Sequence, residues 1–214
     1  MVYPISKLTI RPICMLWVRK VEGLENIEKG KPFIIASNHQ SYCDSLLVPA
    51  AVLPGIDRKI HALVNSYYWK PFVTRIFLNL WEAIPVNVDK KEKSNEKNSQ
   101  SIEKAVNHLK NKELVMIFPE GKRSDGKLKK AYTGVAKIAL MAKVPVLPVG
   151  IIDSNKVLPK GKTFPRFTRC EVKIGKLMYF EKYYNKKGNE KTYQNITRQI
   201  MGQIAKLIGQ KYKY

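Results

Sequence analysis

Cysteine and histidine are scarce in this chain. Only three of each occur in 214 residues. Cys14, Cys43 and Cys170 are odd in number, widely spaced and without a CxxC pair, so a disulfide framework is disfavoured and a reducing compartment is favoured. The histidines are also spread along the chain, and on this ground we expect no metal site.

Long apolar runs are also missing. The two most apolar windows, residues 5–18 and 71–86, are each interrupted by charged side chains. A membrane-spanning helix needs about 20 apolar residues in succession. The first residues also lack the apolar core and cleavage site of a signal peptide. We therefore expect no transmembrane helix.

Acidic residues are few compared with basic ones. Against 17 Asp and Glu stand 39 Lys and Arg, a net charge of +22. This charge indicates an anionic partner, such as nucleic acid, an anionic membrane surface or a phosphate-bearing substrate. Residues 1–25 mix bulky apolar side chains with cations, as a membrane-interface segment does. An ordinary element packed on the core explains them equally well, but the charge favours the membrane surface, where each cation contributes about 1 kcal/mol.

Strand-like and helix-like segments alternate along the chain. We expect strands at 33–37, 59–64, 83–86, 113–118 and 144–152, and helices at 44–52, 67–80, 99–110, 132–142 and 192–211. The polar residues 87–98 predict a loop. This order implies one α/β domain over residues 1–214, with helices flanking a largely parallel central sheet. The apolar stripe of 192–211 favours packing on the core over a second surface contact.

A histidine and an aspartate stand five residues apart where the first strand gives way to the first helix. Five residues turn a helix by about 140°, so the two side chains meet only if His39 lies in the turn and Asp44 in the first helical turn. They would then form a general base with its orienting carboxylate. For an isolated pair of this kind, a surface histidine near a helix cap is the favoured interpretation.

A second polar cluster follows the apolar residues 114–117. Ligands bind at the carboxyl ends of strands in open α/β sheets, and this cluster lies at such an end. Arg123 offers a planar fork that fits a phosphate, and Glu120 could orient it or bind a substrate hydroxyl. A charged, solvated turn is the alternative. The candidate substrate-binding residues of this cluster are Glu120, Gly121, Lys122, Arg123 and Ser124.

Together the two clusters match a known family. The segment from Asn38 to Asp44 resembles the HxxxxD block of the glycerolipid acyltransferases of the 1-acylglycerol-3-phosphate acyltransferase type, and Phe118–Ser124 resembles their FPEGxRS block. Two weaker matches agree with these: Val144–Val149 is similar to the VPxxPV strand, and Lys129-Lys130 with Gly134 resembles the entry of a helix. The resemblance covers residues 30–152.

One block departs from the family pattern. The family has a glycine before an Ile-Pro-Val strand and, after it, an arginine that helps to hold the acceptor phosphate. Here Glu82 replaces the glycine and Val88 replaces the arginine. Lys90 or Lys91 could supply the missing charge, although lysine is a poorer phosphate fork than arginine. The departure bears on the identity of the acceptor more than on the reaction.

The resemblance implies acyl transfer from acyl-CoA or acyl carrier protein to the hydroxyl of a lysophospholipid, most simply 1-acylglycerol-3-phosphate. His39 would be the general base, Asp44 would hold its tautomer, and Asn38 and residues 120–124 would bind the acceptor. The acyl donor is a co-substrate, and no cofactor is expected. The enzyme would lie on the cytoplasmic face of an anionic membrane without spanning it.

Three alternatives stay open on the sequence. The acceptor could be glycerol-3-phosphate or another lysolipid. The thiol of Cys43 could carry the acyl group covalently, although buried thiols are usually inert. The chain could also be a non-catalytic basic module that binds lipid or nucleic acid. We expect no nucleic-acid partner, because no reading motif is present and both clusters would be unexplained.

Overall fold

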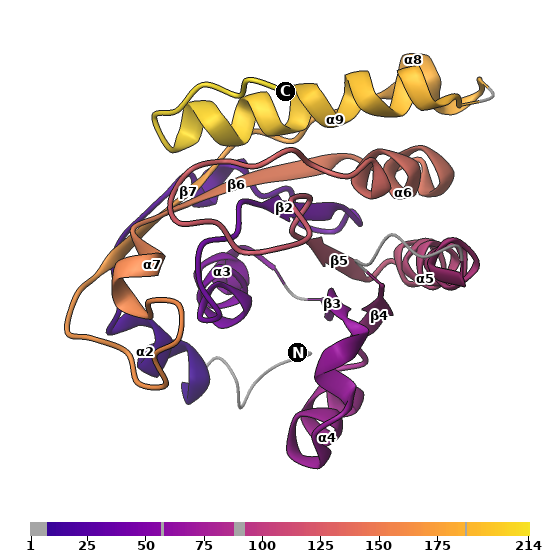
Figure 1. Ribbon diagram of the computed structural model, residues 1–214. Coiled ribbons are helices and arrows are strands. Elements are labelled where there is room, and N and C mark those ends of the chain that lie inside the picture. Colours follow the sequence, from indigo (N-terminus) through magenta and orange to yellow (C-terminus); the bar gives the residue numbers. More distant parts are fainter. Residues whose placement is uncertain (1–7, 57, 88–92, 187) are drawn as a thin grey trace.

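The computed structural model describes residues 8–56, 58–87, 93–186 and 188–214, the side chains of 93–97 excepted. Within these residues the chain forms a seven-stranded sheet in the order β1-β7-β6-β2-β5-β3-β4 (Figure 1). All neighbouring strands run parallel except β6 and β7. The strands are β1 Val18–Glu22, β2 Ile34–Ser37, β3 Ile60–Asn65, β4 Ile84–Val86, β5 Leu114–Ile117, β6 Val146–Ile152 and β7 Cys170–Ile174.

Helices cover both faces of the sheet. The helices α5, α6 and α9 lie on one face, and α2 and α3 lie on the other (Figure 1). The helices are α2 Ile10–Met15, α3 Asp44–Val52, α4 Phe72–Leu80, α5 Lys93–Lys110, α6 Gly134–Ala142, α7 Ser154–Val157, α8 Glu181–Tyr184 and α9 Glu190–Leu207, with 3-10 turns at Leu24–Asn26, Leu53–Gly55 and Ser66–Trp69.

The central strands are apolar at every position because both of their faces are covered. In β2, Ile34 and Ala36 belong to the core under α5, α6 and α9, whereas Ile35 belongs to the core under α2 and α3. Parallel strands buried on both faces characteristically have such continuous apolar runs. The predicted class, an α/β fold with a largely parallel sheet flanked by helices, is confirmed.

Several predicted boundaries need correction. The helix expected over 67–80 is two elements, because Pro71 has no backbone N–H to donate and α4 begins only after it. Part of the predicted loop 87–98 is helical, since α5 already begins at Lys93. The C-terminal helix is confirmed as a core element, because α9 packs on β6 and α6.

Part of the N-terminal segment, residues 1–25, for which the sequence predicted a membrane interface, belongs to the sheet. Residues 18–22 form β1, an edge strand that pairs with β7, so they belong to the sheet. The predicted set of strands included neither β1 nor β7. Helix α2 buries Cys14 but leaves Ile13 and Leu16 more than half exposed. Residues 1–7 lie outside the described part of the chain. Among the described residues, no helix has the length and apolarity to cross a membrane.

The order of the strands brings the two polar clusters together. Strands β2 and β5 are parallel neighbours, and Ala36 lies beside Ile117 near their carboxyl ends. The segments that leave these strands begin with Asn38-His39 and with Phe118, respectively. Both clusters therefore meet at one edge of the sheet, where open α/β sheets bind their ligands.

Candidate active site

The turn after β2 joins His39 to Asp44. His39 Nδ1 lies 2.9 Å from Asp44 Oδ2, and the same oxygen accepts backbone N–H bonds from Gln40 at 2.7 Å and Ser41 at 2.8 Å. Asp44 is fully buried, whereas the His39 side chain is 15% exposed. His39 therefore lies in the turn and Asp44 in the first helical turn, the arrangement in which the two can meet. A carboxylate on Nδ1 leaves Nε2 as the ring nitrogen for a substrate proton.

Phe118 and the backbone of the second cluster fix the position of His39. The ring of Phe118 stacks on the imidazole with centroids 4.1 Å apart. Ser124 donates to the carbonyl of His39 through its backbone N–H at 2.8 Å and its hydroxyl at 3.2 Å. The segment after β5 thus contacts both the ring and the backbone carbonyl of His39.

Glu120 and Ser124, which the sequence assigned to substrate binding, form their hydrogen bonds within the protein. Glu120 is 1% exposed, and its two oxygens accept from the backbone N–H groups of His39 at 3.0 Å and Lys129 at 2.7 Å. Burial raises the pKa of Glu120, and these two hydrogen bonds oppose the rise. Both residues are positioning groups that tie the two loops together, because their polar atoms are already used and buried.

Asn38, which was also assigned to substrate binding, is paired within the protein as well. Its amide nitrogen donates to the carbonyl of Ile151 at 2.8 Å, and its amide oxygen accepts the N–H of Ile151 at 2.8 Å. With both ends of the amide paired and the residue 1% exposed, Asn38 fastens the turn to β6.

Gly121, Lys122 and Arg123 line a large cleft together with His39. The guanidinium of Arg123 lies over the ring of Tyr42, 3.3 Å from its centroid. The ammonium of Lys129 donates a hydrogen bond to the backbone carbonyl of Arg123 at 2.8 Å. The aromatic ring and the lysine hold this arginine loop in place, and neither partner was assigned a role from the sequence.

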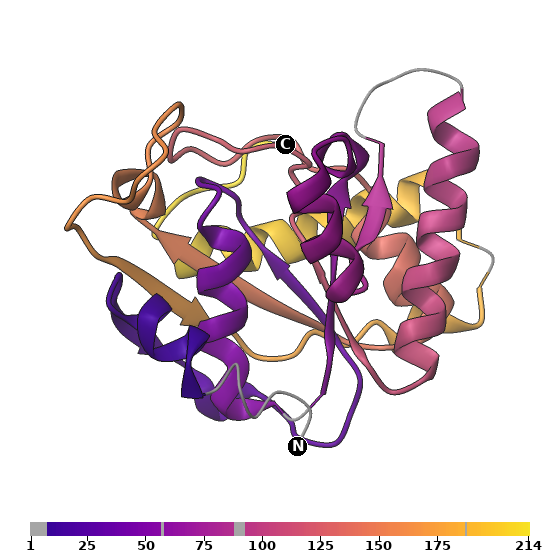
Figure 2. The same cartoon turned by 90° about the horizontal axis from the view of Figure 1, so that it is seen from below.

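The cleft has a volume of about 1410 Å³ and lies between α3 and α4, which face each other in the view from below (Figure 2). Its described lining contains no Asp or Glu. Six cations line it: Arg11, Lys122, Arg123, Lys129, Lys137 and Lys160. The rest of the lining is largely apolar and includes Leu46, Leu53, Leu63, Phe77, Ile102 and Ile138. Such a lining suits an amphiphile with an anionic head group and a hydrocarbon chain.

The block that departs from the family pattern borders the same cleft. Val86 and Asn87 line it, whereas Val88, Lys90 and Lys91 lie outside the described residues. Glu82 has φ +49°, in the left-handed region that favours glycine. Arg11 and Lys160 add charge to the cleft from distant parts of the sequence, and no local pattern around either residue indicates that role.

Cys43 is poorly suited to a covalent mechanism. Its thiol lies 3.7 Å from the carbonyl of Ser154, and burial raises its pKa to about 11. The thiol, not the nucleophilic thiolate, therefore predominates near neutral pH.

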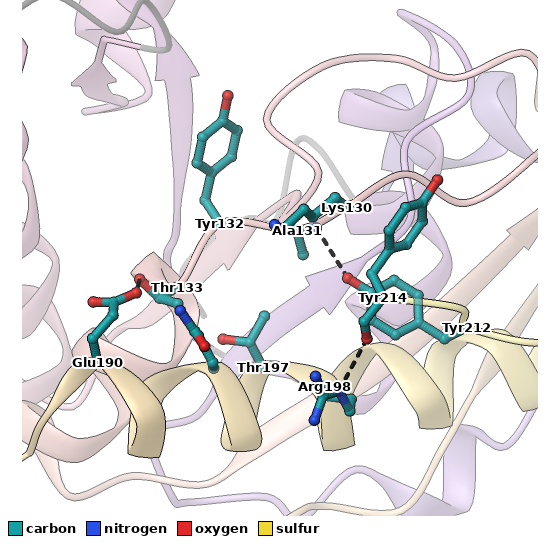
Figure 3. A pocket seen from close by; sticks show the side chains of 10 residues that line it. Lys130, Ala131, Tyr132, Thr133, Glu190, Thr197, Arg198, Tyr212 and Tyr214 are labelled. Atoms are coloured by element: carbon teal, nitrogen blue, oxygen red, sulfur yellow. Dashed lines mark hydrogen bonds between the residues drawn. The ribbon is translucent and has the colours of Figure 1, made fainter.

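A second pocket, of about 420 Å³, lies between α9, residues 130–133 and the C-terminal tyrosines (Figure 3). Tyr212 accepts the N–H of Ala131 at 3.0 Å, and Arg198 donates to the carbonyl of Tyr214 at 3.0 Å. The residues described along its wall do not include His39 or Arg123. These contacts fasten the segment that ends in Tyr132, which reaches the large cleft.

Comparisons with known proteins agree with the two motifs. The sequence profile described as Acyltransferase matches residues 18–152. The 1-acyl-sn-glycerol-3-phosphate acyltransferase of Bacillus subtilis is 30% identical over 148 residues, 67% of this chain and 68% of that protein. The bovine 1-acyl-sn-glycerol-3-phosphate acyltransferase alpha is 29% identical over 158 residues, 72% of this chain. The chain spans about half of that bovine protein, 52% of its length.

The fold is also similar to a solved structure. The crystal structure of the 1-acyl-sn-glycerophosphate acyltransferase PlsC from Thermotoga maritima superposes with a TM-score of 0.70, covering 97% of this chain and 81% of that one at 23% identity. The profile match over more than half of the chain and the relative from Bacillus subtilis show the family. The chain belongs to the acyltransferase family.

Proposed function

We propose that this protein transfers an acyl group from a thioester donor, acyl-CoA or acyl carrier protein, to the free hydroxyl of 1-acylglycerol-3-phosphate. The observation that carries the proposal is that His39, paired with the buried Asp44, lines a cleft that is cationic in one part and apolar in another. The printed names of the relatives, which are 1-acyl-sn-glycerol-3-phosphate acyltransferases, support this acceptor.

The chemistry follows from the two ring nitrogens of His39. Nε2 accepts the proton of the acceptor hydroxyl as that oxygen attacks the thioester carbonyl. The tetrahedral intermediate then collapses, the carbon–sulfur bond breaks, and the imidazolium returns its proton to the departing thiolate. Asp44, 2.9 Å from Nδ1, fixes the tautomer and stabilises the imidazolium while it exists. The acceptor supplies the oxygen nucleophile, so no acyl-enzyme forms.

The cations of the cleft would bind the phosphate of the acceptor. Arg123 and Lys122 follow the strand adjacent to the one that leads to His39, so a phosphate bound by them would lie near the base. The apolar lining from α3 and α4 would take hydrocarbon. A lysolipid phosphate carries both chemical features and one hydroxyl to acylate.

Replacing Arg123 by alanine is expected to lower kcat/KM for 1-acylglycerol-3-phosphate by about 10- to 100-fold, because charge-assisted hydrogen bonds contribute about 1.5–3 kcal/mol. The rate with 1-acylglycerol, which has no phosphate, should change much less. The measurement is steady-state transfer to both acceptors, with acyl-CoA and acyl carrier protein as donors in parallel. Lys206→Ala, which removes an exposed cation from α9, is the control. An equal loss with both acceptors would refute phosphate recognition by Arg123.

We also propose that α2 and α4 meet an anionic membrane surface. Both helices contribute to the wall of the cleft, and both extend from the same side of the sheet (Figure 1). Helix α4 exposes a row of large apolar side chains, and Arg75 lies among them. The exposed residues are Phe72, Val73, Ile76, Phe77 and Leu80. Apolar side chains next to cations are what peripheral binding requires. A lipid acceptor could then enter the cleft from the bilayer.

The membrane contact can be tested by flotation with vesicles of phosphatidylglycerol and phosphatidylcholine. We expect Phe72→Ser with Leu80→Ser to reduce the bound fraction at least fivefold, because each exposed apolar side chain contributes roughly 1.5–3 kcal/mol when it is fully buried. Phe164→Ser, at another exposed aromatic residue, is the matched control. Undiminished flotation of the double variant would remove α4 from the contact.

A further inference from the structure

Two of the three histidines meet far from the catalytic turn. His61 is the second residue of β3, His108 lies in the last turn of α5, and Glu113 directly precedes β5. The two imidazole rings stack with centroids 3.6 Å apart. Glu113 Oε2 lies 3.0 Å from His61 Nε2 and 2.8 Å from His108 Nδ1. One atom from each side chain thus lies within 4.8 Å of the other two.

The hydrogen bonding of His61 leaves one of its ring nitrogens without a proton. Its Nδ1 lies 3.1 Å from the backbone carbonyl of Glu82, which can only accept, so Nδ1 carries a proton. In the neutral ring, Nε2 is then a lone pair that faces the carboxylate oxygen of Glu113. Nε2 is buried without a hydrogen-bond partner among the described groups, in a side chain that is 1% exposed.

Two electron-rich atoms 3.0 Å apart need a positive centre between them. A shared proton would supply that centre by making His61 an imidazolium. A metal ion satisfies the same lone pairs while the ring stays neutral. The hydrogen bond from Nδ1–H to a backbone carbonyl is also the contact that orients most metal-bound histidines.

The other two side chains of the cluster, those of His108 and Glu113, are accessible from solvent. The side chains of His108 and Glu113 are 25% and 27% exposed, so an ion can enter from that side. The nearby ammonium of Lys59 is paired with Glu82 at 3.2 Å. Two imidazole nitrogens and a carboxylate oxygen are ligands that zinc takes at about 2.0–2.2 Å, with water completing a tetrahedron.

We propose that His61, His108 and Glu113 bind a zinc ion that joins α5 to strands β3 and β5. The site lies at the amino ends of these strands, whereas the catalytic turn follows the carboxyl end of the neighbouring parallel strand β2. The ion is therefore structural: it fastens α5, whose residue Ile102 contributes to the cleft wall, and takes no part in acyl transfer.

The test uses untagged, chelator-treated full-length protein, zinc ion alone as the probe, and metal analysis after removal of free ion. We expect one zinc per chain, a melting temperature at least 4 °C higher with zinc than with chelator, and the visible absorption of tetrahedral cobalt when Co²⁺ replaces zinc. His108→Ala and Glu113→Gln, at partly exposed positions that should leave the fold intact, are each expected to weaken zinc binding at least 100-fold. His39→Ala, which removes the third histidine, should still bind one zinc.

Three results would overturn the proposal. The first is zinc uptake by the wild type no greater than that of His108→Ala. The second is loss of uptake in His39→Ala, which would place the ion in the catalytic turn. The third is binding without any rise in melting temperature, which would remove the structural role. If the cluster holds a shared proton instead of a metal ion, the wild type will take up no more zinc than His108→Ala.

Discussion

Replacing His39 by alanine is expected to lower kcat for acyl transfer by about 10²–10⁴-fold, because this is the usual contribution of a positioned general base and no second imidazole lies in the described wall of the cleft. The substitution removes a ring that is 15% exposed and stacks on Phe118. The cations and the apolar wall stay in place. The loss should therefore appear in kcat, with little change in the KM for the acceptor.

The measurement is the initial rate at saturating donor and acceptor, with circular dichroism and melting temperature as controls for folding. His39→Gln, which keeps a polar side chain of similar length, should be as inactive as His39→Ala, because an amide cannot take up the proton. Activity within tenfold of the wild type in a folded variant would show that another group is the base.

The second large effect is expected for Asp44→Asn, which should reduce kcat by about 10²–10⁴-fold. The carboxylate is fully buried, and one of its oxygens meets His39 Nδ1 and the backbone N–H groups of Gln40 and Ser41. An amide is uncharged and cannot stabilise the imidazolium, and its NH₂ group can force the other tautomer on the ring. The lost charge and the wrong tautomer both impair the proton transfer to His39.

A double variant distinguishes this role from a general loss of structure. If Asp44 acts only through His39, His39→Ala with Asp44→Asn should be no slower than His39→Ala alone, because residues that act as a unit are strongly non-additive. Additive losses would mean that Asp44 contributes independently, and a melting temperature lowered in proportion to the rate would make its role structural.

The contact between His39 and Asp44 and the fold class were predictable from local sequence. Apolar runs bounded by polar residues predict the strand and the helix on either side of His39. The turn between them is short, so Asp44 can occupy few positions relative to His39. Strand β1 was missed because its two apolar residues, Val18 and Val21, are three positions apart, a spacing typical of a helix, and charged residues occupy its other positions.

The roles of single polar residues were less predictable, because they depend on long-range partners. A carboxylate three residues from Arg123 suggests an ion pair. Glu120 instead accepts hydrogen bonds from the backbone N–H groups of His39 and Lys129, which are 81 and 9 residues away. The same reason explains why the cluster of His61, His108 and Glu113 was not predicted. His61 and His108 are 47 positions apart in the sequence, and only the packing of α5 beside β3 stacks their rings.

The central claim, direct transfer to a lipid hydroxyl, is tested most directly by following the label of a ¹³C-acyl thioester through one turnover with 1-acylglycerol-3-phosphate. Mass spectrometry of protein and lipid should show one labelled phosphatidic acid for each thiol released, and no acyl label on the protein before the acceptor is added. Label on Cys43 or another side chain that precedes lipid product, or thiol release without lipid product, would contradict the account.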